Sequence, residues 1–219
     1  MDEKLSQSQA KAIVDTANEI MSNLKTVSEN KNTEFVNTVK KIWEDQHAVD
    51  YFAKHKENMD GFITELDKNN KVFGDAVETI ANYYAKVGGM SAISVAKITL
   101  SPAFDVSAIK KFFADGNGDD FGFVNPASGA AQVMDAFVAL KEALTNAINS
   151  TVERIKAINA FGNPQVKLEI AKSAGKVVEI LQNHIVQAEK LIREYVDETA
   201  QAYVKVGTVS EQAAQLSTN

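Results

Sequence analysis

Apolar residues recur at alternating steps of three and four over four long stretches of this 219-residue chain. This spacing places the apolar side chains on one face of a helix, and such faces pack against each other at shallow crossing angles. The stripes contain Ile13, Ala17, Ile20, Leu24 and Val27; Phe52, Met59, Ile63, Leu66, Phe73, Val77, Ile80, Tyr84 and Val87; Phe137, Leu140, Leu144, Ala147, Thr151, Ile155 and Ile158; and Ile170, Ala174, Val177, Leu181, His184, Ala188, Leu191 and Tyr195. The spacing predicts four long helices, near residues 5–43, 46–88, 129–160 and 164–206.

The stripes have irregularities at identifiable places. The first stripe slips in phase before it resumes at Phe35, Val39 and Ile42, and the fourth slips before Tyr203 and Val206. In the second stripe, Lys56 and Asn70 occupy two polar gaps. His184 falls on the fourth stripe, where we interpret it as a core or rim histidine and not as a ligand.

Helix-breaking residues are concentrated in the centre of the chain. Six of the 11 glycines and two of the 3 prolines lie there, whereas the flanking stretches are rich in helix-forming residues. We therefore predict an all-α protein, an antiparallel four-helix bundle made of two long helical hairpins. The first hairpin spans 1–89, a connector with a short helix spans 90–127, and the second hairpin spans 128–219, with both hairpins in one bundle domain.

The two hairpins resemble each other in sequence. A shift of 118 positions places Trp43 on Phe161 and Asp45 on Asn163. With one further residue of slip, the segment that ends at Gly88, Tyr-Ala-Lys-Val-Gly, aligns with Tyr-Val-Lys-Val-Gly, which ends at Gly207. These matches indicate a duplicated hairpin.

Each hairpin is predicted to turn at a helix cap. Asp45 and Asn163 are residue types that accept hydrogen bonds from the first free N–H groups of a helix. Pro164 follows Asn163 at a first helical position, where its missing N–H costs nothing. Trp43 and Phe161 lie close to these caps, where a large ring can cover the open end of a hairpin. The short connection makes the two helices antiparallel.

Two long helices with heptad spacing, joined at a Trp-x-Gly turn, define the WXG-motif family exported by bacterial type VII secretion. The chain resembles two such hairpins in tandem, with turn motifs at Trp43, Glu44 and Asp45 and at Phe161, Gly162 and Asn163. The resemblance implies a non-enzymatic protein that acts through protein contacts, as a secreted substrate, a partner or an adaptor. Its partners would be the secretion machinery or a co-secreted helical protein.

The chain departs from the family pattern at several positions. Asp45 and Asn163 stand where glycine is expected, and Phe161 stands for tryptophan. No tyrosine is followed four places later by Asp or Glu, as in the export signal of the family, so export with a partner is open. We see no cleavable signal peptide at the N-terminus. The resemblance therefore implies secretion without a cleaved signal or location on the bacterial surface, after synthesis in the cytoplasm.

Composition excludes several kinds of chemistry. The chain has no cysteine, which rules out disulfides and thiolate metal sites, and its net charge of -6 argues against nucleic-acid binding. Glu44 and His47 have the spacing of one half of a di-iron ligand set, but the second half is missing. The polar run Asp115–Asp119 lacks the later ligands of a calcium loop. We identify no catalytic residues, no metal and no cofactor.

The connector is unusually rich in phenylalanine and longer than bundle loops usually are. It contains Phe104, Phe112, Phe113, Phe121 and Phe123, which form a candidate interaction surface. One interpretation is a short helix near 106–114 and a loop packed over one end of the bundle. The alternative is an apolar surface that meets a partner or a lipid bilayer, as in a membrane-active, pore-forming protein. Membrane contact is secondary in our prediction.

Overall fold

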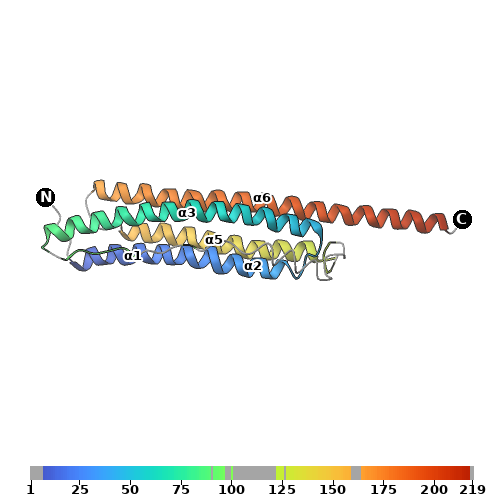
Figure 1. Cartoon of the computed structure of the whole chain (residues 1–219), viewed down its shortest axis with the longest axis horizontal. Helices are drawn as coiled ribbons and strands as arrows, with labels where there is room; N and C mark the ends of the chain where they lie inside the picture. The colour runs from blue at the N-terminus through green and yellow to red at the C-terminus, as the bar shows by residue number, and fades with distance from the viewer. Residues whose placement is uncertain are drawn as a thin grey trace. The chain divides into compact units, whose positions relative to one another are not determined.

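The chain is all-α, and its four long helices pack antiparallel, as the heptad spacing predicts. The computed structural model describes residues 7–89, 91–96, 100, 122–125, 127–158 and 164–217. The helical elements, labelled in Figure 1, are α1 (Gln7–Thr26), the π-helical segment η1 (Val27–Lys31), α2 (Asn32–Val39), α3 (Gln46–Val87), α5 (Gly129–Ile158) and α6 (Pro164–Ser217). The elements α1, η1 and α2 follow one another without a gap and form the first of the four long helices.

The π-helical segment lies where the sequence shows the phase slip. A π turn accommodates one residue more than an α turn. The stripe therefore passes from Leu24 and Val27 to Phe35 and Val39 with one extra residue, and all four side chains are buried. This insertion also brings Asn32 into the core, where it is 2% exposed. The slip is thus a local change of helix type.

The last helix is longer than predicted. The sequence prediction ends near residue 206, before Gly207, whereas α6 continues to Ser217. A glycine inside a helix costs about 1 kcal/mol relative to alanine, which does not by itself stop a helix. The residues that follow include Glu211, Gln212 and two alanines, which are good helix formers.

The buried face of α6 moves by one residue relative to the predicted stripe. Ile192 and Val196 are buried, while the predicted Leu191 and Tyr195 are only half-buried. A straight α-helix has 3.6 residues per turn and drifts by about 20° per heptad from an ideal heptad stripe. Over several heptads this drift transfers the core position to the next residue. The assignment of Leu191 and Tyr195 to the buried stripe was therefore wrong.

The chain forms two compact units, each of which contains part of every long helix. Unit 1 comprises residues 1–31, 60–102 and 142–185. Within it, Arg154 of α5 forms an ion pair with Glu19 of α1, and the rings of Phe62 in α3 and His184 in α6 stack at 4.0 Å between centroids. Most of its core residues are aliphatic, among them Leu24, Leu66 and Leu181, and the rings of Phe62, Phe73 and His184 are buried with them.

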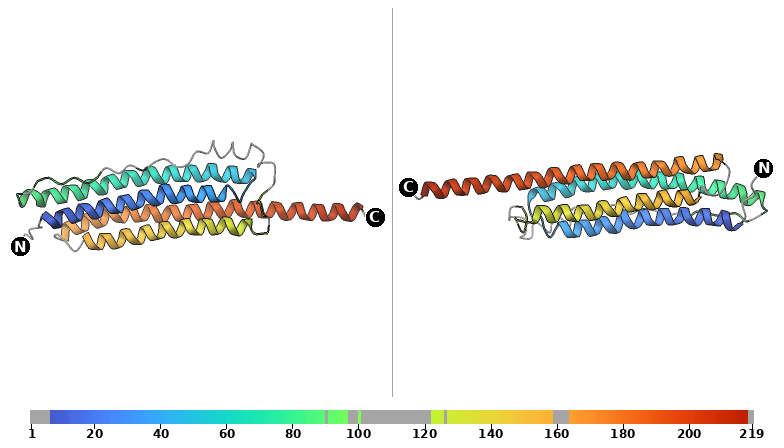
Figure 2. Two further views of the ribbon diagram at one scale, coloured as in Figure 1. Left: turned by 90° about the horizontal axis from the view of Figure 1, so that it is seen from below. Right: turned by 180° about the vertical axis from the view of Figure 1, so that it is seen from behind.

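Unit 2 comprises residues 32–59, 103–141 and 186–219, and its core is rich in aromatic rings. Phe35 of α2 meets Phe137 of α5 edge to face at 6.2 Å. In the same unit, Lys141 of α5 forms a 2.6 Å ion pair with Glu189 of α6. The two further views in Figure 2 show the helical segments of this unit side by side.

The long connection between the hairpins leads from one unit to the other. The helix α3 ends at Val87 in unit 1, and α5 begins at Gly129 in unit 2. The two helices therefore run in the same direction, and each packs against antiparallel neighbours.

Candidate functional site: the Trp43 turn

The turn between α2 and α3 is short because the chain tightens as it leaves the helix. The N–H groups of Ile42 and Trp43 both donate to the carbonyl of Val39, at 2.9 and 3.0 Å. The helix therefore ends at Val39, and residues 40–42 form a turn where the sequence predicts helix up to residue 43. This tightening directs the Trp43 ring into the core of unit 2.

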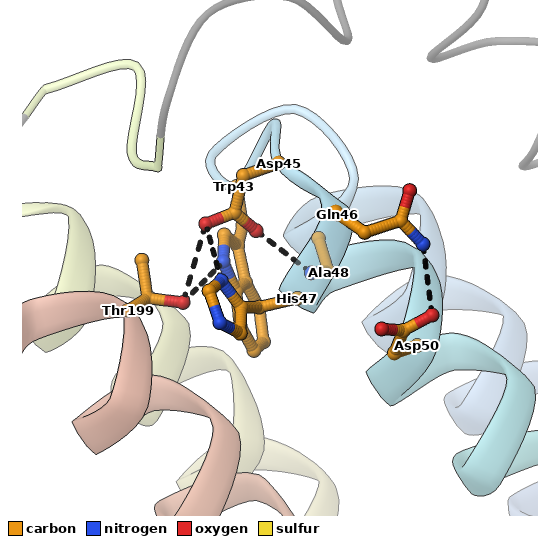
Figure 3. Close-up of polar contacts among 7 residues, drawn as sticks. All are labelled: Trp43, Asp45, Gln46, His47, Ala48, Asp50 and Thr199. Atoms are coloured by element: carbon orange, nitrogen blue, oxygen red, sulfur yellow. Dashed lines mark hydrogen bonds and ion pairs between the residues drawn. The ribbon is translucent and has the colours of Figure 1, made fainter. Parts of the chain in front are cut away.

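Asp45 caps α3, as the sequence predicts. The backbone N–H of Ala48 donates to Asp45 Oδ1 at 2.8 Å, which is the usual bond of an N-cap carboxylate to the third residue of a helix. The other oxygen, Oδ2, accepts a bond from Thr199 Oγ1 at 3.4 Å and lies 3.3 Å from His47 Nδ1. Asp45 is buried, so its carboxylate connects the cap of α3 to α6 inside unit 2 (Figure 3).

Trp43 is fully buried and makes a polar contact with the second hairpin. Its indole Nε1–H donates to Thr199 Oγ1 at 3.2 Å, across 156 positions of sequence. The indole also stacks on Tyr51 of α3 at 5.4 Å with an interplanar angle of 28°. Thr199 thus accepts from Trp43 and donates to Asp45, and it binds both turn residues to α6 (Figure 3).

The end of the connector pairs with this turn through its backbone. Glu44 N–H donates to the carbonyl of Gly122 at 2.7 Å, and Val124 N–H donates to the carbonyl of Ile42 at 2.9 Å. Gly122 has a φ of 95°, a conformation that favours glycine. Phe123, between these bonds, is 4% exposed and lies 5.9 Å from the Trp43 ring.

A second glycine, Gly129, leaves space for the Phe123 ring. A side chain at Gly129, the first residue of α5, would overlap the Phe123 ring. Glycine at this position therefore permits the ring to reach Trp43. The sequence indicates Gly129 only as a helix boundary, because its packing depends on a residue that approaches from the connector.

The cluster is arranged for structure and contact. The Asp45 carboxylate is bonded to a backbone N–H and to a threonine, and Trp43 is enclosed by rings. Among the residues that the structure describes, no three His, Asp or Glu side chains are grouped so that they could hold a metal ion. Two hydrogen bonds to Thr199 join the α2–α3 turn to α6.

The structure describes only part of the predicted site residues. It brings Trp43, Glu44, Asp45 and Phe123 together at one turn. The second turn motif, Phe161, Gly162 and Asn163, lies outside the described residues, as do Phe104, Phe112, Phe113 and Phe121 and the predicted short connector helix. The membrane-active alternative depends on those phenylalanines and stays a prediction.

Two residues of the cluster were missed at the level of sequence. Thr199 is 1% exposed and lies four residues after Tyr195, so it continues the apolar stripe of α6. A polar residue at such a position was a signal that could have identified Thr199 as part of the site. Tyr51 is 0% exposed, yet it precedes the stripe residue Phe52 and was not assigned to the core. Burial raises the pKa of the Tyr51 hydroxyl well above its usual value of 10.

The cores of both units contain further polar side chains. In unit 2, His55 Nε2 lies 2.8 Å from Asn32 Oδ1. In unit 1, His184 and Asn70 are buried and have no hydrogen-bond partner within the described part of the chain. The predicted polar gap at Asn70 is thus a core position. At the other predicted gap, Lys56 is only half-buried, and the core position is taken by its neighbour His55.

Comparison with known proteins identifies no relative. No protein-family model matches the chain, and no curated protein or solved structure matches it significantly. Within the helices that the structure describes, none is long and apolar enough to cross a membrane.

Proposed function

We propose that this chain is a non-enzymatic helical protein of a bacterial type VII secretion system. It acts as a secreted substrate, a partner or an adaptor, and it works through protein–protein contacts. The observation that carries the proposal is the Trp43 turn. A tryptophan closes the end of an antiparallel hairpin, and its indole N–H bonds to Thr199 of the second hairpin. The resemblance to WXG-motif hairpins thus rests on a turn that also joins the two hairpins.

The arrangement of the hairpins supports a duplicated origin. The shift of 118 positions maps Glu19 onto Phe137 and Val36 onto Arg154. Glu19 and Arg154 form an ion pair in unit 1, and Phe137 meets Phe35, one residue from its mapped partner, in unit 2. Equivalent helices therefore meet at equivalent levels. One chain would do here what two separate hairpins do as a dimer.

This function has consequences for location. We propose that the chain is made in the cytoplasm and leaves the cell through the secretion apparatus without a cleaved signal, or is displayed at the surface. Export together with a partner is open, because its tyrosines are not followed by the acidic residue of the export signal. The partner is a component of the apparatus or a co-secreted helical protein.

The test compares export of two destabilised variants in a strain that carries the apparatus. Trp43→Ala removes a fully buried ring at the turn, and Leu66→Ala removes a fully buried side chain of unit 1. Each truncation costs about 2 to 5 kcal/mol of folding free energy, so both lower stability. We expect export and partner capture to fall with Trp43→Ala and to persist with Leu66→Ala. Circular dichroism checks that both variants keep their helices, as we expect.

Equal secretion of the wild type and Trp43→Ala would count against the proposal. Equal loss in both variants would attribute the effect to stability and would also remove the support from the turn. Trp43→Phe adds a finer comparison, because it keeps a ring in the core but lacks the N–H that bonds to Thr199. We expect this variant to show an intermediate level of export.

A further inference from the structure

A segment of the connector lies along α3 in unit 1. We call this segment the strap; it consists of residues 91–96 and Leu100. Its contacts with α3 progress from Asn82 at Ile93 to Asp67 at Leu100, so it runs antiparallel to the helix beside which Figure 2 shows it. From Ile93 to Val95 the strap advances two residues, while its partners on α3 step back four residues, from Asn82 to Glu78, which is about 6 Å at the helical rise. This part of the strap therefore advances about 3 Å per residue, close to the rise of an extended chain.

The helices hold the strap through its backbone. Asn82 pairs with both polar groups of Ile93: its Oδ1 accepts from the N–H at 2.8 Å, and its Nδ2 donates to the carbonyl at 2.9 Å. Glu78 Oε2 accepts from Val95 N–H at 3.0 Å. These two side chains, one turn apart on α3, thus bind an extended backbone as a neighbouring strand would.

Two further bonds extend this pattern. Asn18 Oδ1, on α1, accepts from Ala96 N–H at 2.8 Å, and Asp67 Oδ1 accepts from Leu100 N–H at 3.3 Å. All five bonds are made to main-chain groups. The strap therefore fits this surface largely irrespective of the side chains at its exposed positions.

One strap side chain, that of Val95, packs at a position on α3 that we call the Gly74 seat. Gly74 of α3 is buried, and a Cβ built there would lie 3.4 Å from Val95 Cγ1. Met21 of α1 lies on the same side of this glycine. The β-branched side chain of Val95 thus lies over Gly74, where an added methyl group would be in van der Waals contact with it and a larger side chain would compete for its place. Ser94 and Ala96, on either side of Val95, are exposed.

The surface can also exist without the strap. Asn18, Asp67, Glu78 and Asn82 are all half-buried, so water can replace the bonds to the strap. Such an exchange would be far more costly for fully buried groups. The hydrogen bonds to the strap can therefore be exchanged for bonds to water, while departure of the strap also exposes the apolar surface that the buried Leu100 covers.

We propose that the α1–α3 surface of unit 1 is a binding site for an extended peptide segment of a partner protein, and that the strap is its internal competitor. The partner segment presents a main-chain N–H and carbonyl to Asn82 and a β-branched residue to the Gly74 seat. Proline is excluded at the positions that donate to Asn82 and Glu78. This inference rests on the proposed function, because it names the partner class of a protein that acts through protein contacts.

The experiment measures binding of a fluorescein-labelled peptide with the sequence of residues 88–101 to the full chain by fluorescence anisotropy. The strap variant Ile93→Pro/Val95→Pro lacks the two N–H groups that donate to Asn82 and Glu78. Its matched control, Ala92→Pro/Ser94→Pro, places prolines at neighbouring positions that have no described bond to the helices. A tethered segment competes at a high effective concentration, so we expect the strap variant to bind the peptide at least roughly tenfold more tightly than the wild type or the control.

Substitutions in the surface locate the bound peptide. In the strap-variant background, Asn82→Ala and Gly74→Leu are each expected to weaken peptide binding by roughly tenfold or more. Gly61→Leu is the control, because Gly61 lies on the same helix with open space around it. No binding to the strap variant, or binding that Asn82→Ala leaves unchanged, overturns the proposal. Asn82→Ala keeps the test decisive if Gly74→Leu fails to fold.

A second copy of the chain is a different occupant, and it is tested directly. The chain has no cysteine, so a chain with Gly74→Cys and a chain with Val95→Cys are mixed and oxidised. An interchain disulfide overturns the proposal in favour of strap exchange, whereas disulfide formation only when both cysteines are in one chain supports it. The binding assay uses purified protein and needs no secretion apparatus. Failure of the peptide to bind is thus distinct from failure of export.

Discussion

His184 shows how one side chain couples the core of unit 1 to pH. Its ring is 3% exposed and stacks on Phe62 with an interplanar angle of 15°. Burial lowers its pKa from 6.5 to about 4, because the charged ring would lose its hydration. Neither ring nitrogen has a hydrogen-bond partner within the described residues. The folded state therefore contains a neutral histidine at neutral pH.

We expect His184 to make the protein less stable in acid. The unfolded chain binds a proton at His184 near pH 6.5, whereas the folded chain does so only near pH 4. The stability is therefore complete above pH 6.5 and is lost as the pH falls from 6.5 to 4, by on the order of 3 kcal/mol. Guanidinium unfolding at pH 7.5 and pH 4.5 measures the loss. His184→Leu should remove the part of this loss that comes from His184, whereas His47→Gln, which replaces a half-buried histidine of unit 2, should leave that part unchanged.

The turn residues illustrate what a local pattern can predict. Asp45 follows the end of one apolar stripe and precedes the next, and it caps α3 as its residue type indicates. Trp43 lies beside that cap and is fully buried. The sequence could not identify Phe123 as its neighbour, because that contact depends on a backbone pairing between segments about eighty positions apart. Local chemistry therefore predicted the cap, and tertiary contact supplied the partner.

At the scale of elements, the π-helical segment explains the phase slip of the first helix, which the apolar stripe alone leaves ambiguous. A phase slip in a heptad pattern is compatible with a break, a kink or a change of helix type. Here the chain remains helical from Gln7 to Val39, and Val27–Lys31 absorb one extra residue. Because the buried residues on both sides keep their places, the extra residue is an insertion relative to a regular helix.

Removal of that extra residue should be tolerated. Deleting the exposed Asn30 leaves a spacing of four, three and four from Val27 onward, so an uninterrupted α-helix can bury the same side chains. Deleting the exposed Lys68 from α3 instead shifts every core residue on one side of the deletion. In thermal unfolding by circular dichroism, we expect a change within about 1 kcal/mol for the first deletion and loss of cooperative unfolding for the second. Equal damage by both deletions would contradict this account.

At the scale of the whole molecule, every long helix contributes residues to both compact units. The helices α3, α5 and α6 each contribute residues to both units without interruption. Each hairpin is likewise divided between the units, so neither unit corresponds to one hairpin. The domain boundaries at residues 89 and 128 therefore stay a prediction about sequence repeats.

We expect the units to unfold together. Trp43 is the one tryptophan of the chain and reports on unit 2 by its fluorescence, while far-ultraviolet circular dichroism reports on all helices. Because breaking a continuous helix at the boundary exposes backbone groups of both units, the two signals should share one denaturation midpoint. Leu66→Ala in unit 1 should shift both midpoints equally. A fluorescence midpoint that ignores this substitution would show that the units are independent.

Apolar periodicity, caps and breakers act over a few neighbouring residues, and for that reason they predict the four helices and most of their ends. They also indicate the slip in the first helix and the cap at Asp45. The contacts of Thr199 with Trp43, of Phe123 with the turn and of the strap with α3 could be seen only in the folded chain. Those contacts join segments far apart in the chain, and the free energy that selects them comes from burial and hydrogen bonding in the folded state.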